Sequence, residues 1–302
     1  MSPAADGRRL GLGTAQLGMD YGVANRTGAP GEEVARSLVS GAWKGGIRLF
    51  DTASHYGQSE AVLGRSLAAL VGPEDLDQAR VVSKVHPDVD PLAEGALERC
   101  LTGSLTLLGM PRLYGLLLHR EEHLSRWDEI RPQMDALRDQ GLLDRAGVSV
   151  YRVESALAAL RCSGLDLLQV PSNILDRRFE SAGIFERAAA AGVEVQVRSV
   201  FLQGLLLLDG EEIPAGLAQA RPFVEAFRDF CRQSGLSARR VALGYALAAY
   251  PEAEILVGAE TPDQVRENLT SAARLPEDLV HEARRRFPSI PEQVLNPSLW
   301  RY

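Results

Sequence analysis

The feature of this sequence that most constrains its fold is an alternation, repeated eight times, of a short apolar run and a longer stretch with helical spacing. Runs of this kind are typical of strands buried on both faces, as in a parallel sheet covered by helices. Eight such units within about 250 residues predict a single (β/α)8 TIM barrel rather than an open sheet. The runs are Leu10–Leu17, Ile47–Ala53, Val81–Val85, Tyr114–His119, Arg145–Val150, Leu167–Pro171, Val193–Val200 and Ile255–Ala259, and the helical stretches are 32–45, 59–70, 92–108, 125–140, 153–163, 181–191, 238–250 and 262–271.

Two segments lie outside this alternation. Residues 201–237 follow the seventh run and hold an extra helical stretch near 220–234, and a tail runs from about residue 277 to Tyr302. A chain of 302 residues is long enough for two domains, but no Ser/Gly-rich linker or change of composition divides it. We therefore predict one domain over residues 1–302.

Charge and cysteine content exclude several classes of protein. The formal net charge is −7, which argues against nucleic acid or an anionic membrane as a partner. The three cysteines are far apart and form no Cys-x-x-Cys pair, so neither a disulfide framework nor a thiolate zinc site is indicated. No apolar segment reaches the length of a membrane span, and no leader is evident, so we expect a cytoplasmic protein.

Polar side chains follow three neighbouring strands at the point where each strand ends. The strand predicted from the second run ends in Asp51, that from the third in Lys84 and that from the fourth in His119. The carboxyl ends of the strands form the mouth of a barrel, where active sites of such folds lie. An aspartate after one strand is commonly only a helix cap or turn residue, but a buried lysine needs a partner. Asp51 can be that partner, and the three side chains together predict an active site.

A tyrosine in the next loop extends this group. Tyr56 precedes Gly57, which permits a sharp turn, and Ser59 is positioned to cap the following helix. The turn would lean Tyr56 over Lys84, whose ammonium would lower the pKa of the phenol from about 10. We expect Tyr56 to act as a general acid.

At these positions the chain resembles the aldo-keto reductase family. The similarity lies in Asp-Thr-Ala-x-x-Tyr-Gly-x-Ser-Glu from Asp51, in Lys84 and His119, and in segments of the first, fifth and eighth runs. The resemblance implies hydride transfer from a reduced nicotinamide to an aldehyde or ketone. In that chemistry Tyr56 protonates the carbonyl oxygen, and Lys84 lowers the pKa of Tyr56. Asp51 holds Lys84 in place, and His119 orients the carbonyl group.

The resemblance also implies a cofactor site. Ser149 and Gln169 match residues that hold the nicotinamide carboxamide, although Val150 replaces a frequent asparagine. Arg198 stands where a tyrosine usually stacks on the ring. The loop after it is expected to cover the pyrophosphate and contains Ser199, Phe201, Gln203 and Gly204. The adenosine half is expected against Gly258, Ala259, Gln264, Glu267 and Asn268.

The resemblance favours NADP(H), but one residue opposes it. Glu260 replaces a position that is often basic in the family, and its carboxylate would repel a ribose 2′-phosphate, which leaves NAD(H) open. Arg266 either compensates or faces solvent. We therefore expect NADP(H) as cofactor, with NAD(H) as the alternative.

The substrate is expected to be a small carbonyl compound, with a sugar or natural-product carbonyl as the leading class by analogy. The segment 20–26 and the tail 296–302 are candidate substrate walls, although Trp300 could instead pack on the barrel exterior. Two alternatives stay open: an epimerase or dehydrogenase that retains its cofactor, and a non-catalytic barrel that senses nicotinamide. A metal site at His55, His86 and His119 is disfavoured by the neighbouring Lys84, and no oligomeric state is indicated.

Overall fold

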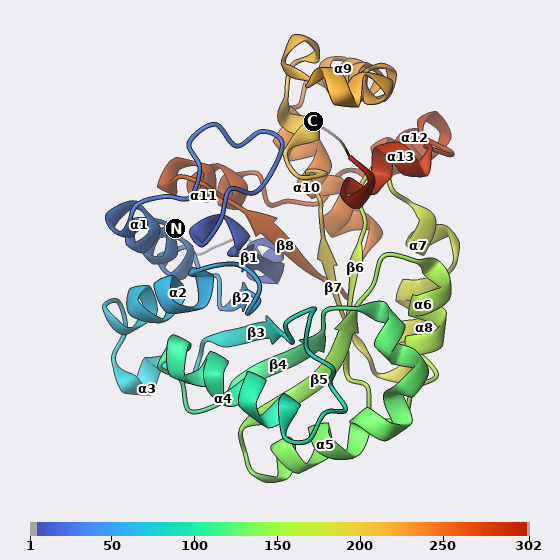
Figure 1. The fold of residues 1–302 in the computed structure, drawn as a ribbon. Coiled ribbons are helices and arrows are strands. Elements are labelled where there is room, and N and C mark those ends of the chain that lie inside the picture. The colour runs from blue at the N-terminus through green and yellow to red at the C-terminus, as the bar shows by residue number, and fades with distance from the viewer. Residues whose placement is uncertain (1–4, 301–302) are drawn as a thin grey trace.

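The computed structural model describes residues 5–300, and in it eight parallel strands close into a barrel in sequence order, with β8 pairing β1 (Figure 1). The predicted (β/α)8 fold is confirmed. The strands are β1 (Leu10–Gly13), β2 (Leu49–Asp51), β3 (Arg80–Lys84), β4 (Leu113–Leu118), β5 (Leu143–Ser149), β6 (Leu167–Pro171), β7 (Glu194–Arg198) and β8 (Glu254–Gly258).

Helices surround the strands (Figure 1). The predicted extra helix after the seventh strand is α9, and both it and the tail helix α12 pack against α10. The α-helices are α1 (Glu32–Lys44), α2 (Ser59–Ala68), α3 (Pro73–Leu76), α4 (Ala96–Leu108), α5 (Trp127–Asp139), α6 (Val153–Ala159), α7 (Arg178–Ser181), α8 (Ile184–Ala191), α9 (Arg221–Ser234), α10 (Ala238–Ala249), α11 (Pro262–Thr270), α12 (Glu277–Arg286) and α13 (Glu292–Leu295). Among the residues that the structure describes, no helix is long and apolar enough to cross a membrane.

Several predicted boundaries were wrong, and local backbone geometry explains them. The first strand ends at Gly13, because the chain turns there into a 3-10 helix over Ala15–Leu17. The seventh strand ends at Arg198, because Ser199 adopts a left-handed φ of 62°. The helix predicted over 92–108 is α4, which begins at Ala96, after Gly95 at φ 62°. Apolar residues recur on both sides of all three points, so composition alone does not mark them.

The barrel interior is arranged in layers. At the amino ends of the strands, Arg80 pairs with Glu254 at 2.7 Å, and the Tyr114 hydroxyl donates to Glu194. A layer of aliphatic side chains follows these polar residues toward the carboxyl ends of the strands. A second polar layer, which includes Asp51, Lys84 and Gln169, lies at the carboxyl ends themselves. The aliphatic layer consists of Leu49, Val82, Leu117, Leu167 and Leu256.

Two glycines make room for that aliphatic layer. A Cβ on Gly115 would lie 2.9 Å from the side chain of Leu167, and a Cβ on Gly147 would overlap the Leu167 carbonyl group. Gly147 is paired in register with Leu167. The Leu167 side chain therefore requires a glycine on β4, and its backbone carbonyl requires one on β5.

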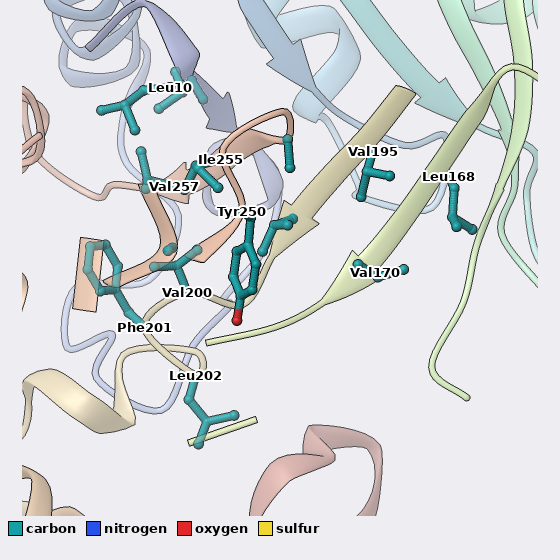
Figure 2. Close-up of a cluster of buried hydrophobic side chains, with 14 of the residues drawn as sticks. Leu10, Leu168, Val170, Val195, Val200, Phe201, Leu202, Tyr250, Ile255 and Val257 are labelled. Carbon is teal, nitrogen blue, oxygen red and sulfur yellow. The ribbon is translucent and has the colours of Figure 1, made fainter. Parts of the chain in front are cut away.

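The main core lies between the barrel and its helices, and it extends beneath the loop after β7. Figure 2 shows Val200, Phe201 and Leu202 of this loop among side chains of β6, β7 and β8 and near Tyr250. Tyr250 is fully buried and its hydroxyl pairs with the Ser172 hydroxyl at 2.9 Å. The loop is thus anchored by its own apolar side chains, each buried leucine contributing about 2 kcal/mol.

Candidate active site

The centre of the site is a buried ion pair. The Lys84 ammonium donates to Asp51 Oδ1 at 2.6 Å and to the Thr52 carbonyl at 2.8 Å, and its side chain is 1% exposed. β2 and β3 pair in parallel register, which places their carboxyl ends side by side. Burial lowers the pKa of Lys84, and the adjacent carboxylate opposes that shift. The predicted pairing of these two residues is present.

Amide side chains surround the carboxylate. Gln169 Nε2 donates to Asp51 Oδ1 at 2.7 Å, and the Ser149 hydroxyl donates to Gln169 Oε1 at 3.2 Å. Gln196, which no sequence pattern indicated, lies 3.4 Å from Gln169 Nε2. Ser149 and Gln169, which were predicted to share one site, are therefore in contact, and Gln169 also donates a hydrogen bond to Asp51.

Tyr56 reaches the ion pair through a tight backbone approach. Gly57 has φ 55°, and a Cβ there would overlap the Gly18 carbonyl oxygen, so the loop can pass close to the chain after β1. The Lys84 ammonium lies 5.0 Å from the centre of the Tyr56 ring. Among residues 5–300, no hydrogen bond is made to the Tyr56 hydroxyl, which belongs to a residue lining a cavity.

Two expectations for this loop were wrong. Burial, followed by the Asp51 charge, raises the pKa of Tyr56 above its usual value, whereas a lowered pKa was expected from Lys84 alone. The phenol is therefore firmly protonated. Ser59 does not cap its helix; it is the first helical residue, and its hydroxyl donates to the Thr14 carbonyl at 2.7 Å. Ser59 thus joins α2 to the loop after β1.

His119 faces the same group from the end of β4. Its ring is perpendicular to that of Tyr56, with the ring centres 6.0 Å apart. Burial, aided by the charges of Lys84 and Arg198, lowers the pKa of His119 to about 3. The imidazole is neutral at ordinary pH, and its buried Nδ1 has no hydrogen-bond partner within residues 5–300.

Two further histidines lie at the rim. His55 Nδ1 and His86 Nε2 are 3.1 Å apart, and the rings of His55 and His119 are perpendicular, with their centres 6.2 Å apart. Within the described part of the chain, no group of three or more His, Cys, Asp or Glu side chains has an arrangement that could hold a metal ion.

Arg198 points to the same end of the barrel from β7. Its guanidinium donates to the Val150 carbonyl at 3.1 Å, approaches the Ser149 hydroxyl at 3.4 Å and lies 4.0 Å over the Tyr151 ring. In the described residues it has no carboxylate within ion-pair distance. Tyr151, which no sequence pattern indicated, thus packs against one face of the guanidinium.

A cavity begins beside this group and runs along the carboxyl ends of the strands. It encloses about 220 Å³ and is open to solvent at its mouth. It extends from Asp51 and Tyr56 past Arg198 to Glu260 and Gln264. Of the predicted cofactor residues, those lining it are Arg198, Ser199, Phe201, Gln203, Gly204, Gly258 and Gln264.

The loop after β7 forms one wall and is conformationally unusual. Ser199, Leu202 and Gln203 have φ values of 62°, 49° and 53°, and they are the only non-glycine residues with positive φ in the described chain. Such backbone costs energy and tends to occur at functional sites. The Val23 amide donates to the Gln203 carbonyl at 2.9 Å, so the loop after β1 meets this wall across the cavity.

The far end of the cavity contains opposite charges. Glu260 and Gln264 line it, together with Arg239 at the start of α10, a residue that the sequence analysis missed. Arg239 pairs with Glu267 at 3.1 Å and donates to Asn268, whose Nδ2 lies 3.3 Å from the Gly258 carbonyl oxygen. Nothing in the spacing around Arg239 distinguished it from a surface helix residue.

Several predicted residues do not reach the cavity wall. Arg266 pairs with Asp263 at 2.9 Å and is 70% exposed, so it faces solvent rather than compensating Glu260. The tail up to Trp300 contributes no lining residue, and Trp300 packs against the main core. The remaining predicted residues are not among those that line the cavity in this structure: Lys84, His119, Ser149, Gln169, Ala259, Glu267 and Asn268.

Comparison with known proteins agrees with this architecture. The model of the aldo/keto reductase family matches residues 9–284. The NADH-specific methylglyoxal reductase of Escherichia coli is 24% identical over 300 residues, covering 87% of this chain and 89% of that protein. A solved structure from Pseudomonas aeruginosa, described as that of an aldo-keto reductase, is 27% identical to this chain with a TM-score of 0.66. The match covers 88% of this chain and 89% of that one. A Klebsiella pneumoniae aldo/keto reductase, solved with NADP and acetate, has the same fold at 22% identity, a TM-score of 0.70 and coverage of 93% and 92%.

Proposed function

The chain belongs to the aldo/keto reductase family and is a nicotinamide-dependent oxidoreductase acting on carbonyl groups, and from this premise we propose that it reduces a small polar aldehyde or ketone with Tyr56 as the proton donor. The observation behind this proposal is the convergence of Tyr56, the Lys84–Asp51 pair and a neutral His119 at one end of a long cavity.

The reaction needs one hydride and one proton. A reduced nicotinamide, when bound, supplies the hydride to the carbonyl carbon, and two electrons leave the cofactor with it. The Tyr56 hydroxyl gives its proton to the carbonyl oxygen, and a proton from solvent restores the phenol. Because burial keeps the phenol protonated until negative charge builds on the oxygen, proton loss is coupled to that step.

The neighbouring residues stabilise charge at the oxygen. A neutral imidazole at His119 donates a hydrogen bond without itself losing a proton, which suits a residue that orients a carbonyl. The Lys84 ammonium, 5.0 Å from the Tyr56 ring centre, stabilises the phenolate that forms transiently. Asp51 fixes the position of that ammonium.

The cavity supports the assignment of a dinucleotide. The amides of Phe201 and Gln203 make no hydrogen bond within residues 5–300, which leaves them available to phosphate oxygens. At the far end, Arg239 is balanced by Glu267, so Glu260 adds an unbalanced negative charge to the wall. We therefore assign NADH as the preferred cofactor over NADPH, against the preference that the family resemblance implied.

The polar rim favours a hydroxylated substrate. His55 and His86 carry hydrogen-bonding nitrogens beside His119, and Tyr21 lines the cavity nearby. A sugar-derived aldehyde matches such a surface better than an apolar ketone does, and this extends the expectation drawn from the sequence.

The experiment is a parallel titration of the purified protein with NADH and NADPH, followed by oxidation of the bound cofactor on addition of a short hydroxyaldehyde such as glyceraldehyde. We expect NADH to bind at least tenfold more tightly. A Glu260→Arg variant should reverse this order, and Asp263→Arg, an exposed change on the same helix, should change it far less.

Three results would count against the proposal in different ways. Binding of neither cofactor at millimolar concentration would contradict the oxidoreductase assignment for this cavity. Cofactor that copurifies and is not consumed on turnover would favour the epimerase or retained-cofactor dehydrogenase. Binding without turnover of any carbonyl, unchanged by Tyr56→Phe, would favour the sensor.

A further inference from the structure

The charge balance at the reactive end of the cavity is uneven. Lys84 and Asp51 neutralise each other through a 2.6 Å contact. His119 is neutral, because its pKa is held near 3, and burial keeps Tyr21 and Tyr56 protonated by raising their pKa values. Among the described residues that line this end of the cavity, Arg198 is then the one charge without an opposite charge to pair with.

Arg198 is held rigidly rather than neutralised. Its contacts are the Val150 carbonyl, the Ser149 hydroxyl and the Tyr151 ring, none of which bears a negative charge. A guanidinium is protonated at any ordinary pH. A fixed positive charge therefore faces the cavity beside Tyr56.

The reacting ring must lie in this part of the cavity, which rests on the proposed function. Hydride transfer needs the reacting atoms about 3–3.5 Å apart, and the carbonyl oxygen must at the same time reach Tyr56. A ring that satisfies both conditions lies within a few ångströms of the wall that Arg198 shares with Tyr56.

Oxidised and reduced nicotinamides differ in charge at that ring. The oxidised ring is a cation, and the reduced ring is neutral, while the rest of the dinucleotide is identical. We propose that Arg198 is a specificity determinant for cofactor redox state: its uncompensated charge repels the oxidised ring, so the site binds the reduced cofactor more tightly than the oxidised one.

The charge of Arg198 should affect the affinity for the cofactor more than the rate of hydride transfer. During hydride transfer, Arg198 opposes positive charge building on the ring but favours negative charge building on the carbonyl oxygen, and these effects act in opposite directions. After the step only the cationic ring is left, once the product alcohol has its proton. Spent cofactor should therefore leave quickly and be replaced by reduced cofactor.

The test is calorimetric or fluorescence titration of NADH and NAD⁺ with the full-length protein, without substrate. Coulomb's law with an effective dielectric constant of about 20 makes the repulsion worth a factor of about ten or more in affinity. We expect the ratio Kd(NAD⁺)/Kd(NADH) to exceed ten in the unmodified protein. It should fall about tenfold in Arg198→Met and be largely retained in Arg198→Lys.

Arg239→Met is the matched control. Arg239 also lines the cavity, but at the end beside Glu267 and Gln264, where the two redox forms are identical. This variant should weaken both forms alike and leave the ratio unchanged. Circular dichroism and Tm establish that each variant is folded, and the ratio in the unmodified protein tests the proposal without any variant.

The outcomes separate the two proposals. If neither redox form binds, the proposed function fails and the inference fails with it. If both bind and the ratio in the unmodified protein is near one, or if Arg198→Met leaves a large ratio intact, the redox discrimination by Arg198 is overturned while the proposed function stands.

Discussion

At the scale of single residues, the site separates proton donation from cofactor binding. Tyr56 lines the cavity, and the ion pair beside it is almost fully buried. Replacing Tyr56 with Phe removes one oxygen and keeps the ring. We expect turnover to fall by about 10²–10⁴-fold with the Kd of NADH nearly unchanged, as measured by steady-state kinetics and titration. A variant that keeps full turnover would exclude Tyr56 as the donor.

The buried pair makes a prediction about stability. In Lys84→Met the Asp51 carboxylate is left buried with the Gln169 amide as its one side-chain partner, so we expect the free energy of unfolding to fall by about 3–5 kcal/mol. Urea denaturation measures it. The control is Arg65→Met, which breaks the exposed pair with Glu32 and should cost about 0–1 kcal/mol. Equal losses in the two variants would contradict the burial argument.

His119 predicts a dependence on pH. Its pKa is about 3 in the folded chain, against about 6.5 when unfolded. As the pH falls below 6.5, His119 is protonated in the unfolded chain but stays neutral in the folded chain. The free energy of unfolding therefore decreases progressively towards pH 3. His119→Asn should reduce the loss of urea midpoint between pH 7.5 and 4.5, whereas exposed His281→Asn should not. A parallel loss in all three proteins would contradict the assignment.

The residues that could be predicted from sequence are those whose position follows from the strand pattern. Asp51, Lys84 and His119 end neighbouring strands, and parallel pairing brings strand ends together. Arg239 could not be found this way, because its place in the cavity depends on how α10 packs. The pKa of Tyr56 could not be predicted either, because it depends on burial, which a motif does not show.

At the scale of elements, the loop between β2 and α2 determines where Tyr56 lies. A Cβ on Gly57 would overlap the Gly18 carbonyl, and the φ of 55° costs a non-glycine residue about 1–2 kcal/mol. Gly57→Ala should therefore lower kcat with a modest fall in Tm. Gly103→Ala, on an exposed face of α4 with open space around it, is the control and should leave kcat unchanged. Normal kcat in Gly57→Ala would show that Tyr56 does not depend on this contact.

Element boundaries were less predictable than element order. The eight runs predicted the order of the strands, because a strand buried on both faces needs apolar residues throughout. The ends at Gly13 and Arg198 are set by turns, and apolar residues such as Leu17 and Val200 recur beyond them. The strained segment from Ser199 to Gly204 was read partly as strand for the same reason.

At the scale of the whole molecule, the closed barrel predicts cooperative behaviour. β1 and β8 pair with each other, so opening either end of the chain breaks the ring of strands. We expect one unfolding transition, coincident by circular dichroism and tryptophan fluorescence. NADH at 100 times its Kd should raise the stability by about 2.7 kcal/mol. Two separated transitions would contradict the single-domain prediction.

The glycines beneath the active site also restrict how this protein can diversify. With Gly115 and Gly147 accommodating Leu167, sliding one strand past its neighbour by a single position would drive leucine into backbone and turn its partners outward. The register of these barrel strands is therefore fixed by packing, and so are the positions of the residues at the ends of the strands. New substrate preferences would therefore arise by editing the loops, while the frame that aligns Asp51 with Lys84 stays the same.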